Sequence, residues 1–221
     1  MTPRARLTRV ALWRHGQTAW NVQGRFQGQT DVALDQLGEA QARVAAEVLA
    51  RLAPSALVSS DLQRARRTAQ ALSELTGLSV RLDPDLRETH GGVFQGLTGD
   101  EIRARYPTEW AALAAGDPHV RAEGGESRVE VAARMVRAVL RAADDLPDDG
   151  LAVLATHGGA ARMAVARLIG LPLEQLGSLG VISNTAWTLL ERRTSGAGGD
   201  TWVLVEHNAR TLPEPVTIEE G

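Results

Sequence analysis

Several residue types are absent from this chain of 221 residues, and each absence removes a class of function. The chain has no cysteine, which excludes disulfides, thiol nucleophiles and cysteine metal sites. All 24 residues counted as lysine or arginine are arginine, which excludes Schiff-base chemistry and the lysine-dependent phosphate-binding loop. No apolar run approaches the roughly 18 residues that a membrane span needs, and the first ten residues lack a signal-peptide core. We therefore expect a cytoplasmic protein with no membrane partner.

The overall composition is that of an ordinary globular protein. The formal net charge is -3, with acidic and basic residues interspersed, so no charged face favours nucleic acid as a partner. The hydrophobic content of 43% is enough for a core, and there is no internal repeat or low-complexity linker. We expect a single domain over residues 1–221, with about 210–221 forming a frayed tail.

Strand and helix patterns alternate along the chain. The expected strands are 6–13, 56–60, 150–156, 180–192 and 201–207. The expected helices are 35–54, 60–77, 101–106, 127–144 and 158–170. This alternation predicts an α/β fold, a three-layer α/β/α sandwich with a mostly parallel central sheet. Helical spacing of apolar residues predicts which face of two helices meets the core. These residues are Leu37, Ala40, Val44, Ala45, Val48 and Leu52 in 35–54, and Val129, Ala132, Ala133, Val136, Val139 and Leu140 in 127–144.

Two expected strands end in the same dipeptide, His15-Gly16 and His157-Gly158. Taken singly, either histidine is more often a packing or capping residue than a functional one. The carboxyl ends of parallel strands meet at one edge of a sheet, where functional sites gather. The matched pair therefore predicts that both imidazoles lie at that edge.

Two arginines lie next to these positions. Arg14 lies at a strand end near the core, where burying its charge costs free energy unless it meets an anion. Its planar guanidinium group suits carboxylate or phosphate oxygens. Ser60 and Gln63 match a capping box, which predicts a helix start at Ser60 and puts Arg64 in the first turn. A cation there opposes the helix dipole unless an anion is bound. Gly16, lacking Cβ, would let backbone N–H groups approach that ligand. Arg66 and Arg67 are interpreted as solvated.

Glu88 lies in a glycine-rich stretch in which Gly91, Gly92 and Gly96 are interpreted as serving loop geometry. A carboxyl group on such a loop is usually solvated. A site with two arginines and two histidines, however, lacks a proton donor for a leaving alkoxide, and Glu88 could supply it. Ser127 and Glu130 form a further capping box, which we interpret as structural. Glu126, just before it, is a candidate for a side chain that faces the pocket.

These residues together resemble the histidine phosphatase superfamily, the phosphoglycerate-mutase-like group. The segments that carry this resemblance follow one another in the same order as in the family. They are "LWRHGQTAWN", "RFQGQTDVALDQLGEAQA", "SSDLQRARRTA", "LRETHGGVFQGLT", "GGESRVEVAAR" and "VLATHGG". The resemblance covers most of the chain between Val10 and Val205 and implies the fold of that family.

The resemblance also implies a mechanism. His15 would attack phosphorus to form a phosphohistidine, and Glu88 would act as acid and then as base. The resemblance assigns substrate binding to Arg14, Asn21, Gln27, Arg64, His157 and Gly158. It implies no metal and no cofactor, a small phosphorylated metabolite as the partner, and a homodimer as a possible assembly.

The segment between Glu88 and Gly124 is short and not especially basic, unlike the corresponding insertion of the family's phosphoglycerate mutases. This favours hydrolysis over mutase action. Several blocks, with Gln95 among them, are similar to the actinobacterial subfamily that hydrolyses glucosyl-3-phosphoglycerate. Val93-Phe94 and the segment 106–122 depart from that subfamily, so another small ester such as α-ribazole phosphate or a sugar phosphate stays open, as does a phosphate-binding module without activity. Possible contacts to the rest of the substrate are Arg25, Trp110, His119 and Arg121.

Overall fold

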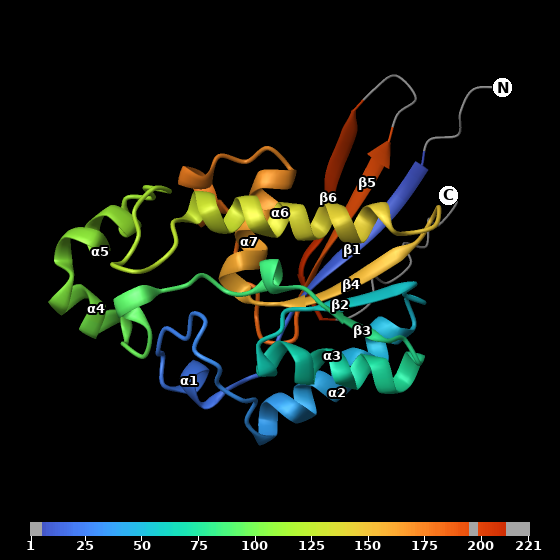
Figure 1. The fold of residues 1–221 in the computed structure, drawn as a ribbon, viewed down its shortest axis with the longest axis horizontal. Helices are drawn as coiled ribbons and strands as arrows, with labels where there is room; N and C mark the ends of the chain where they lie inside the picture. The colour runs from blue at the N-terminus through green and yellow to red at the C-terminus, as the bar shows by residue number, and fades with distance from the viewer. Residues whose placement is uncertain (1–5, 195–198, 211–221) are drawn as a thin grey trace, which may run out of the picture.

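The computed structural model describes residues 6–194 and 199–210, and within them the chain forms one six-stranded sheet covered by helices (Figure 1). The strands are β1 (Arg6–Arg14), β2 (Ala56–Ser59), β3 (Val80–Leu82), β4 (Leu151–Thr156), β5 (Trp187–Thr194) and β6 (Asp200–Ala209). Their order is β3-β2-β4-β1-β5-β6. Strands β1 to β4 are parallel, whereas β5 runs antiparallel to both β1 and β6. The predicted mostly parallel sheet is confirmed.

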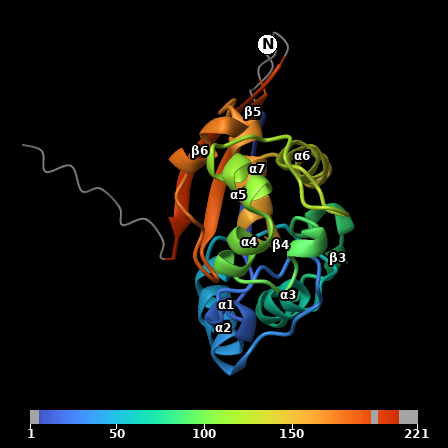
Figure 2. The same ribbon diagram turned by 90° about the vertical axis from the view of Figure 1, so that its left-hand side faces the viewer.

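Helices cover both faces of this sheet. They are α1 (Ala19–Val22), α2 (Gln36–Ala50), α3 (Gln63–Thr76), α4 (Gly99–Arg105), α5 (Pro107–Ala114), α6 (Arg128–Asp144) and α7 (Gly158–Leu168), with short 3-10 segments η1 (Pro84–Leu86), η2 (Gly92–Phe94) and η3 (Leu173–Ser178). Side chains of β1 alternate between two cores: Val10 and Leu12 pack with α6 and α7, and Ala11 and Trp13 pack with α2 and α3. The three-layer sandwich is thereby confirmed, and Figure 2 shows α4 and α5 standing in front of the sheet at one end.

The predicted inner faces of two helices are partly wrong, although Ala45 of α2 and Ala132 and Val139 of α6 are buried as expected. In α2, Leu37 and Val44 are 53% and 64% exposed, and in α6 Val129 and Ala133 are exposed. The buried residues of α2 are Gly38, three alanines and Leu49, whereas α6 buries Val131, Arg134, Met135 and Val139 besides its alanines. Alanine-rich helices have a weak apolar stripe, so close backbone contacts decide their orientation. A Cβ on Gly38 of α2 would stand 2.1 Å from the carbonyl oxygen of Gln17.

The strand predicted over 180–192 begins only at Trp187. The residues before it form a loop whose polar groups bond to the end of β1 instead of to a strand ladder. Thr185 N–H donates to the carbonyls of Arg14 and His15, and Asn184 Nδ2 donates to the His15 carbonyl at 3.0 Å. The loop therefore fixes the point where β1 ends. Of the expected frayed tail only Arg210 lies within the described residues.

Candidate active site

The two histidines lie side by side at the carboxyl ends of neighbouring strands. β1 and β4 are paired in parallel up to Arg14 and Thr156, so His15 and His157 leave the sheet at the same edge. Their ring centroids are 5.2 Å apart, and His15 and His157 are 3% and 0% exposed. The predicted convergence of the two imidazoles is confirmed.

The hydrogen bonds of His15 assign its tautomer. Nδ1 lies 2.7 Å from the carbonyl oxygen of Gly16, which can only accept, so Nδ1 carries the proton. Nε2 accepts from Arg64 Nε at 3.3 Å and therefore holds the lone pair. Burial, and then the charges of Arg64 and Arg14, lower the pKa of His15 well below 6.5. The imidazole is neutral, with an unprotonated Nε2 beside a guanidinium.

Gly16 has a different role from the predicted one. Its N–H donates to Thr68 Oγ1 at 3.1 Å and is not available to a ligand. A Cβ on this residue would stand 2.3 Å from the carbonyl oxygen of Gly38. The glycine is needed because the end of β1 touches the first turn of α2.

The predicted capping box at Ser60 is wrong. Helix α3 starts at Gln63, whose N–H is capped by Asp31 Oδ1 at 2.8 Å from a distant loop. Ser60 Oγ lies instead 3.0 Å from His157 Nε2 and accepts the Leu62 N–H. A remote aspartate can satisfy the helix start as well as a local serine, which frees this hydroxyl to orient His157.

Arg64 still lies in the first turn of α3, fully buried. Its Nη1 and Nη2 donate to the carbonyls of Thr30 and Gly28 at 2.8 and 2.7 Å, which hold the guanidinium against His15. Burial is the main cause that lowers its pKa to about 10. Arg64 therefore remains a cation at neutral pH.

Arg14, the last residue of β1, is the second arginine of the site. Its Nη1 donates to the carbonyl oxygen of Ile182 at 2.6 Å, and its buried Nε has no partner among the described residues. Burial lowers the pKa of Arg14, and the nearby Glu88 charge partly opposes this. A Cβ on Gly158 would lie 3.2 Å from Cδ and Nε of Arg14. Gly158 thus makes room for the arginine.

Glu88 is held at the N-terminus of α7. Its Oε2 accepts the N–H of Gly159 at 3.0 Å, and its Oε1 accepts those of Ala160 and Thr89 at 2.9 and 2.8 Å. A Cβ on Gly159 would stand 2.8 Å from Oε1, so only glycine lets the carboxyl group approach. Sequence reasoning missed Gly159, although the doubled glycine after His157 could have indicated it.

Arg134, a buried arginine of α6, supports the loop that carries Glu88. Arg134, 8% exposed, donates to the carbonyls of Asp85, Arg87 and Glu88 at 2.6–2.9 Å. It also pairs with Glu126 at 2.8 Å, and Glu126 accepts the N–H of His90. Glu126 therefore serves mainly to anchor this loop, and Arg134 is a site residue that the sequence did not reveal.

A central cavity of about 290 Å³ connects these groups. Among the predicted residues it is lined by Arg14, His15, Asn21, Gln27, Arg64, Glu88 and Gly158, and by Arg25. His157 lies behind this lining, beside His15. Arg121 lines a neighbouring cavity, His119 faces a separate hollow, and Trp110 packs against the small cluster of Phe94, Ile102 and Ala122.

Polar atoms without partners are concentrated around the central cavity. Four of the five buried ones found among the described residues are Arg14 Nε, Gln27 Oε1, His157 Nδ1 and Arg162 Nε. Asn21, by contrast, is fixed: its Oδ1 accepts from Thr18 N and Asn184 Nδ2. Buried polar groups are rarely left unsatisfied, so this concentration is typical of a ligand site. The charges of Arg14 and Arg64 suit an anion.

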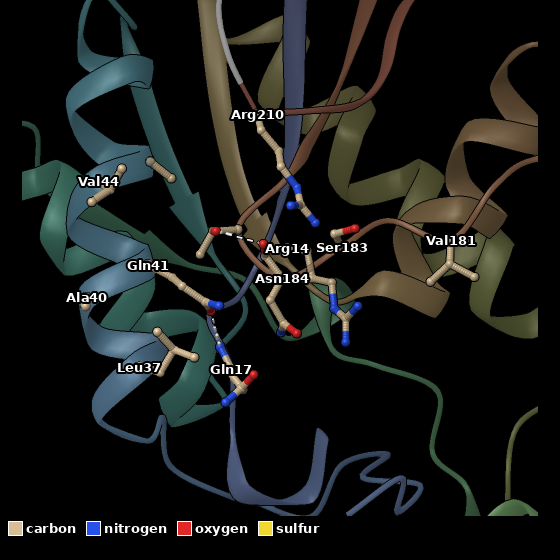
Figure 3. A pocket seen from close by; sticks show the side chains of 12 residues that line it. Arg14, Gln17, Leu37, Ala40, Gln41, Val44, Val181, Ser183, Asn184 and Arg210 are labelled. Atoms are coloured by element: carbon tan, nitrogen blue, oxygen red, sulfur yellow. Dashed lines mark hydrogen bonds between the residues drawn. The ribbon is translucent and has the colours of Figure 1, made fainter. Parts of the chain in front are cut away.

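The central cavity is not the largest hollow. An outer groove of about 700 Å³ lies between α2 and the segment around Ser183 and Asn184 (Figure 3). It shares Arg14 and Val181 with the central cavity but lacks His15 and Glu88. Within residues 6–194 and 199–210, no group of three or more His, Asp or Glu side chains is arranged to hold a metal ion. No helix in those residues has both the length and the apolar character needed to cross a membrane.

Comparisons with known proteins agree with this geometry. The model of the histidine phosphatase superfamily, branch 1, matches residues 10–209. Glucosyl-3-phosphoglycerate phosphatase of Mycobacterium tuberculosis is 45% identical over 195 residues, 84% of this chain and 86% of the relative. A probable phosphoglycerate mutase of Erwinia tasmaniensis is 39% identical over 166 residues, 75% of this chain and 77% of the relative.

Two solved structures share the fold of this chain. The structure of mycobacterial glucosyl-3-phosphoglycerate phosphatase with VO3 has a TM-score of 0.82 and 44% identity, and the match covers 91% of this chain and 98% of that chain. A putative alpha-ribazole-5'-P phosphatase from Escherichia coli shares the fold, with a TM-score of 0.79 at 22% identity over 94% of this chain and 99% of that chain. On the family match and these identities, the chain belongs to the histidine phosphatase superfamily.

Proposed function

We propose that this protein is a phosphatase that hydrolyses a small phosphate monoester through a phosphohistidine on His15. The observation that carries the proposal is the state of His15: a neutral imidazole whose unprotonated Nε2 faces Arg64 in a cavity with Arg14 and Glu88. A nitrogen lone pair beside two guanidinium groups suits attack on a phosphoryl group, because the arginines neutralise charge on the phosphoryl oxygens.

In the first step, Nε2 of His15 attacks phosphorus, so a P–N bond forms while the ester P–O bond breaks. Glu88 gives its carboxyl proton to the leaving oxygen. The imidazole ring becomes positively charged, and the bond from Nδ1–H to the Gly16 carbonyl at 2.7 Å stabilises that charge. Arg14, Arg64 and His157 bind the phosphoryl oxygens. Asn21, Gln27 and Gly158 line the same cavity and contact the substrate there.

In the second step, water attacks the phosphohistidine. The Glu88 carboxylate takes a proton from this water, the P–N bond breaks, and inorganic phosphate leaves. His15 returns to its neutral form with the proton still on Nδ1. The backbone N–H groups of Gly159 and Ala160 keep the carboxyl group in place for both transfers.

For the substrate we propose glucosyl-3-phosphoglycerate, on the support of the mycobacterial relatives that carry this name at 45% identity. The identity to probable phosphoglycerate mutases is lower and covers less of the chain, which favours hydrolysis over mutase action. Action in the cytoplasm and assembly as a homodimer stay predictions, the second to be checked by sedimentation.

Two measurements test the proposal. Release of inorganic phosphate from a panel of phosphorylated metabolites, including glucosyl-3-phosphoglycerate, gives the substrate preference from kcat/KM. The protein is mixed with an ester labelled at its phosphorus and quenched rapidly in alkali, in which a phosphoramidate is stable. Label should remain bound to the wild-type protein and not to His15→Ala. Undiminished hydrolysis by His15→Ala would refute the mechanism, and comparable kcat/KM across unrelated esters would refute a dedicated substrate.

A further inference from the structure

A second cavity of about 270 Å³, here called the side cavity, opens beside the central cavity. The two share Phe26, Thr89, Gly159, Arg162 and Met163 as lining residues. The rest of the side cavity combines apolar and polar side chains. The apolar ones are Phe94, Leu113, Val120, Ala122 and Leu176, and the polar ones are His90, Arg121, Glu126 and Arg128. A substrate that places its phosphoryl group at His15 can therefore extend its organic part into the side cavity.

Arg162 of α7 lies where the two cavities meet. Its Nη2 donates to the carbonyls of Leu176 and Leu179 at 2.7 and 2.6 Å, which fixes the direction of the guanidinium. Its Nε is buried and has no partner, and within the described residues Arg162 forms no ion pair. Burial, and then the charge of Arg128, lower the pKa of Arg162.

The other charges of the side cavity are balanced, except for Arg128. Arg121 pairs with Glu130 at 2.9 Å, and Glu126 pairs with Arg134 at 2.8 Å. Arg128 donates only to the carbonyl oxygen of Leu113 at 3.1 Å and, like Arg162, has no carboxylate partner in the described part of the chain. Two partly buried guanidinium groups without acidic partners are suited to bind an anion that enters the side cavity.

We propose that Arg162, with Arg128 behind it, binds a second anionic group of the substrate, a carboxylate, while the phosphoryl group of the same molecule lies at His15. This inference rests on the proposed function and narrows it to phosphate esters that carry a carboxylate. A carboxylate oxygen can accept the buried Nε–H of Arg162 that has no partner among the described residues. The glycerate part of the proposed substrate carries such a group.

The test compares two esters that differ only at this group: 3-phosphoglycerate and glycerol 3-phosphate, in which a hydroxymethyl group replaces the carboxylate. We expect the wild type to prefer 3-phosphoglycerate. Arg162→Gln should lower the ratio of the two kcat/KM values by about tenfold or more, mainly through KM, because a charged hydrogen bond is lost. Arg128→Gln should lower the ratio in the same direction by less, and Arg162→Lys should restore part of it.

A binding measurement separates this inference from the proposed function. The dissociation constants of both esters are measured on His15→Ala, with and without Arg162→Gln, where no turnover occurs. A lowered binding ratio supports the carboxylate site even if the wild type hydrolyses neither ester. A ratio left unchanged, or equal losses for both esters, would overturn it.

The matched control is Arg167→Gln, which removes the same charge from an exposed position of the same helix. It should leave both esters unaffected. If Arg167→Gln lowers the ratio as much as Arg162→Gln does, the effect is one of general charge and the inference is wrong.

Discussion

The second glycine after His157 gives a sharp test of how Glu88 is held. Gly159 is the second residue of α7, and its N–H donates to Glu88 Oε2 at 3.0 Å. In Gly159→Ala, the new Cβ would stand 2.8 Å from Oε1 and 3.2 Å from Oε2. Ordinary contact distances begin near 3.4 Å, so the carboxyl group must withdraw by about 0.6 Å. The bond from Ala160 N–H, 2.9 Å long, then stretches toward the limit for a hydrogen bond.

The expected loss follows from what a general acid contributes. A positioned acid contributes roughly 10²–10⁴-fold, and a misplacement of about 1 Å costs on the order of 10². A shift of about half that size should lower kcat/KM by roughly tenfold. Alanine is favoured over glycine inside a helix by about 0.8–1 kcal/mol, and the weakened hydrogen bond costs about 1 kcal/mol. The melting temperature of Gly159→Ala should therefore hardly change.

The assay compares two leaving groups. kcat/KM reports the steps up to P–O cleavage, so an alkyl phosphate, which needs protonation, should show the roughly tenfold loss in Gly159→Ala. With p-nitrophenyl phosphate the leaving group departs as a stable anion, and the loss should be much smaller. Glu88→Gln removes the acid completely, so its loss of kcat/KM with the alkyl phosphate should be larger than that of Gly159→Ala, again with a much smaller loss for p-nitrophenyl phosphate.

Gly177→Ala is the control, because a Cβ on that residue meets nothing within 4 Å. It should leave kcat/KM for both esters at the wild-type level. Equal losses with the alkyl and the p-nitrophenyl ester in Gly159→Ala would refute the role of Glu88 as acid. An unchanged rate with both would refute the claim that this glycine positions the carboxyl group.

Three further variants or conditions test other parts of the site. Burial, Arg64 and Arg14 depress the pKa of His15 in the folded protein, so only the unfolded chain takes up a proton on this residue below about pH 6.5. The free energy of unfolding, measured by urea melts, should therefore fall from pH 7 to pH 5.5, and the contribution of His15 to that fall is up to about 1.4 kcal/mol per pH unit. In His15→Ala the fall should be smaller by that contribution. Arg134→Met should cost about 3–5 kcal/mol and lower kcat, because it leaves Glu126 unpaired and releases the Glu88 loop; wild-type stability would show that this network is dispensable. Gly16→Ala, with its Cβ 2.3 Å from the Gly38 carbonyl, should cost about 1–3 kcal/mol, and an unchanged melting temperature would contradict that contact.

The sequence predicts the parts of this site that lie on regular elements. The strand ends at Arg14 and His157 follow from apolar runs that stop at polar residues, and a parallel sheet brings such ends to one edge. Leu62, Ala65 and Ala69 recur at helical spacing and are all buried, so the helix itself is predictable. Arg64 lies in its first turn although the capping box that placed it there is wrong, because α3 starts at Gln63. Local periodicity is enough in these cases because the partner surface is the sheet itself.

The sequence does not predict contacts that depend on distant backbone. Nothing near Gln63 indicates that Asp31 caps α3, since the two residues meet only after the chain has folded. Arg134 looks like any arginine of an amphipathic helix until three carbonyls of the Glu88 loop are brought against it. The inner face of α2 is misjudged for the same reason, because Gly38 packs against Gln17 and turns Leu37 and Val44 outward.

The glycines around the site act by permitting close approach. Gly16 lets β1 touch α2, Gly158 leaves space for Arg14, and Gly159 leaves space for Glu88. Gly16 and Gly158 directly follow the two histidines of the proposed mechanism, and Gly159 is the next residue after Gly158. At these points the chain leaves the sheet, and groups from several elements must meet in a small volume. A side chain at Gly158 would displace Arg14, one at Gly159 would displace Glu88, and one at Gly16 would push the end of β1 away from α2. The doubled glycine after His157 is therefore best understood as a steric requirement of bringing an arginine and a carboxyl group to one helix N-terminus, and not as a phosphate-binding loop.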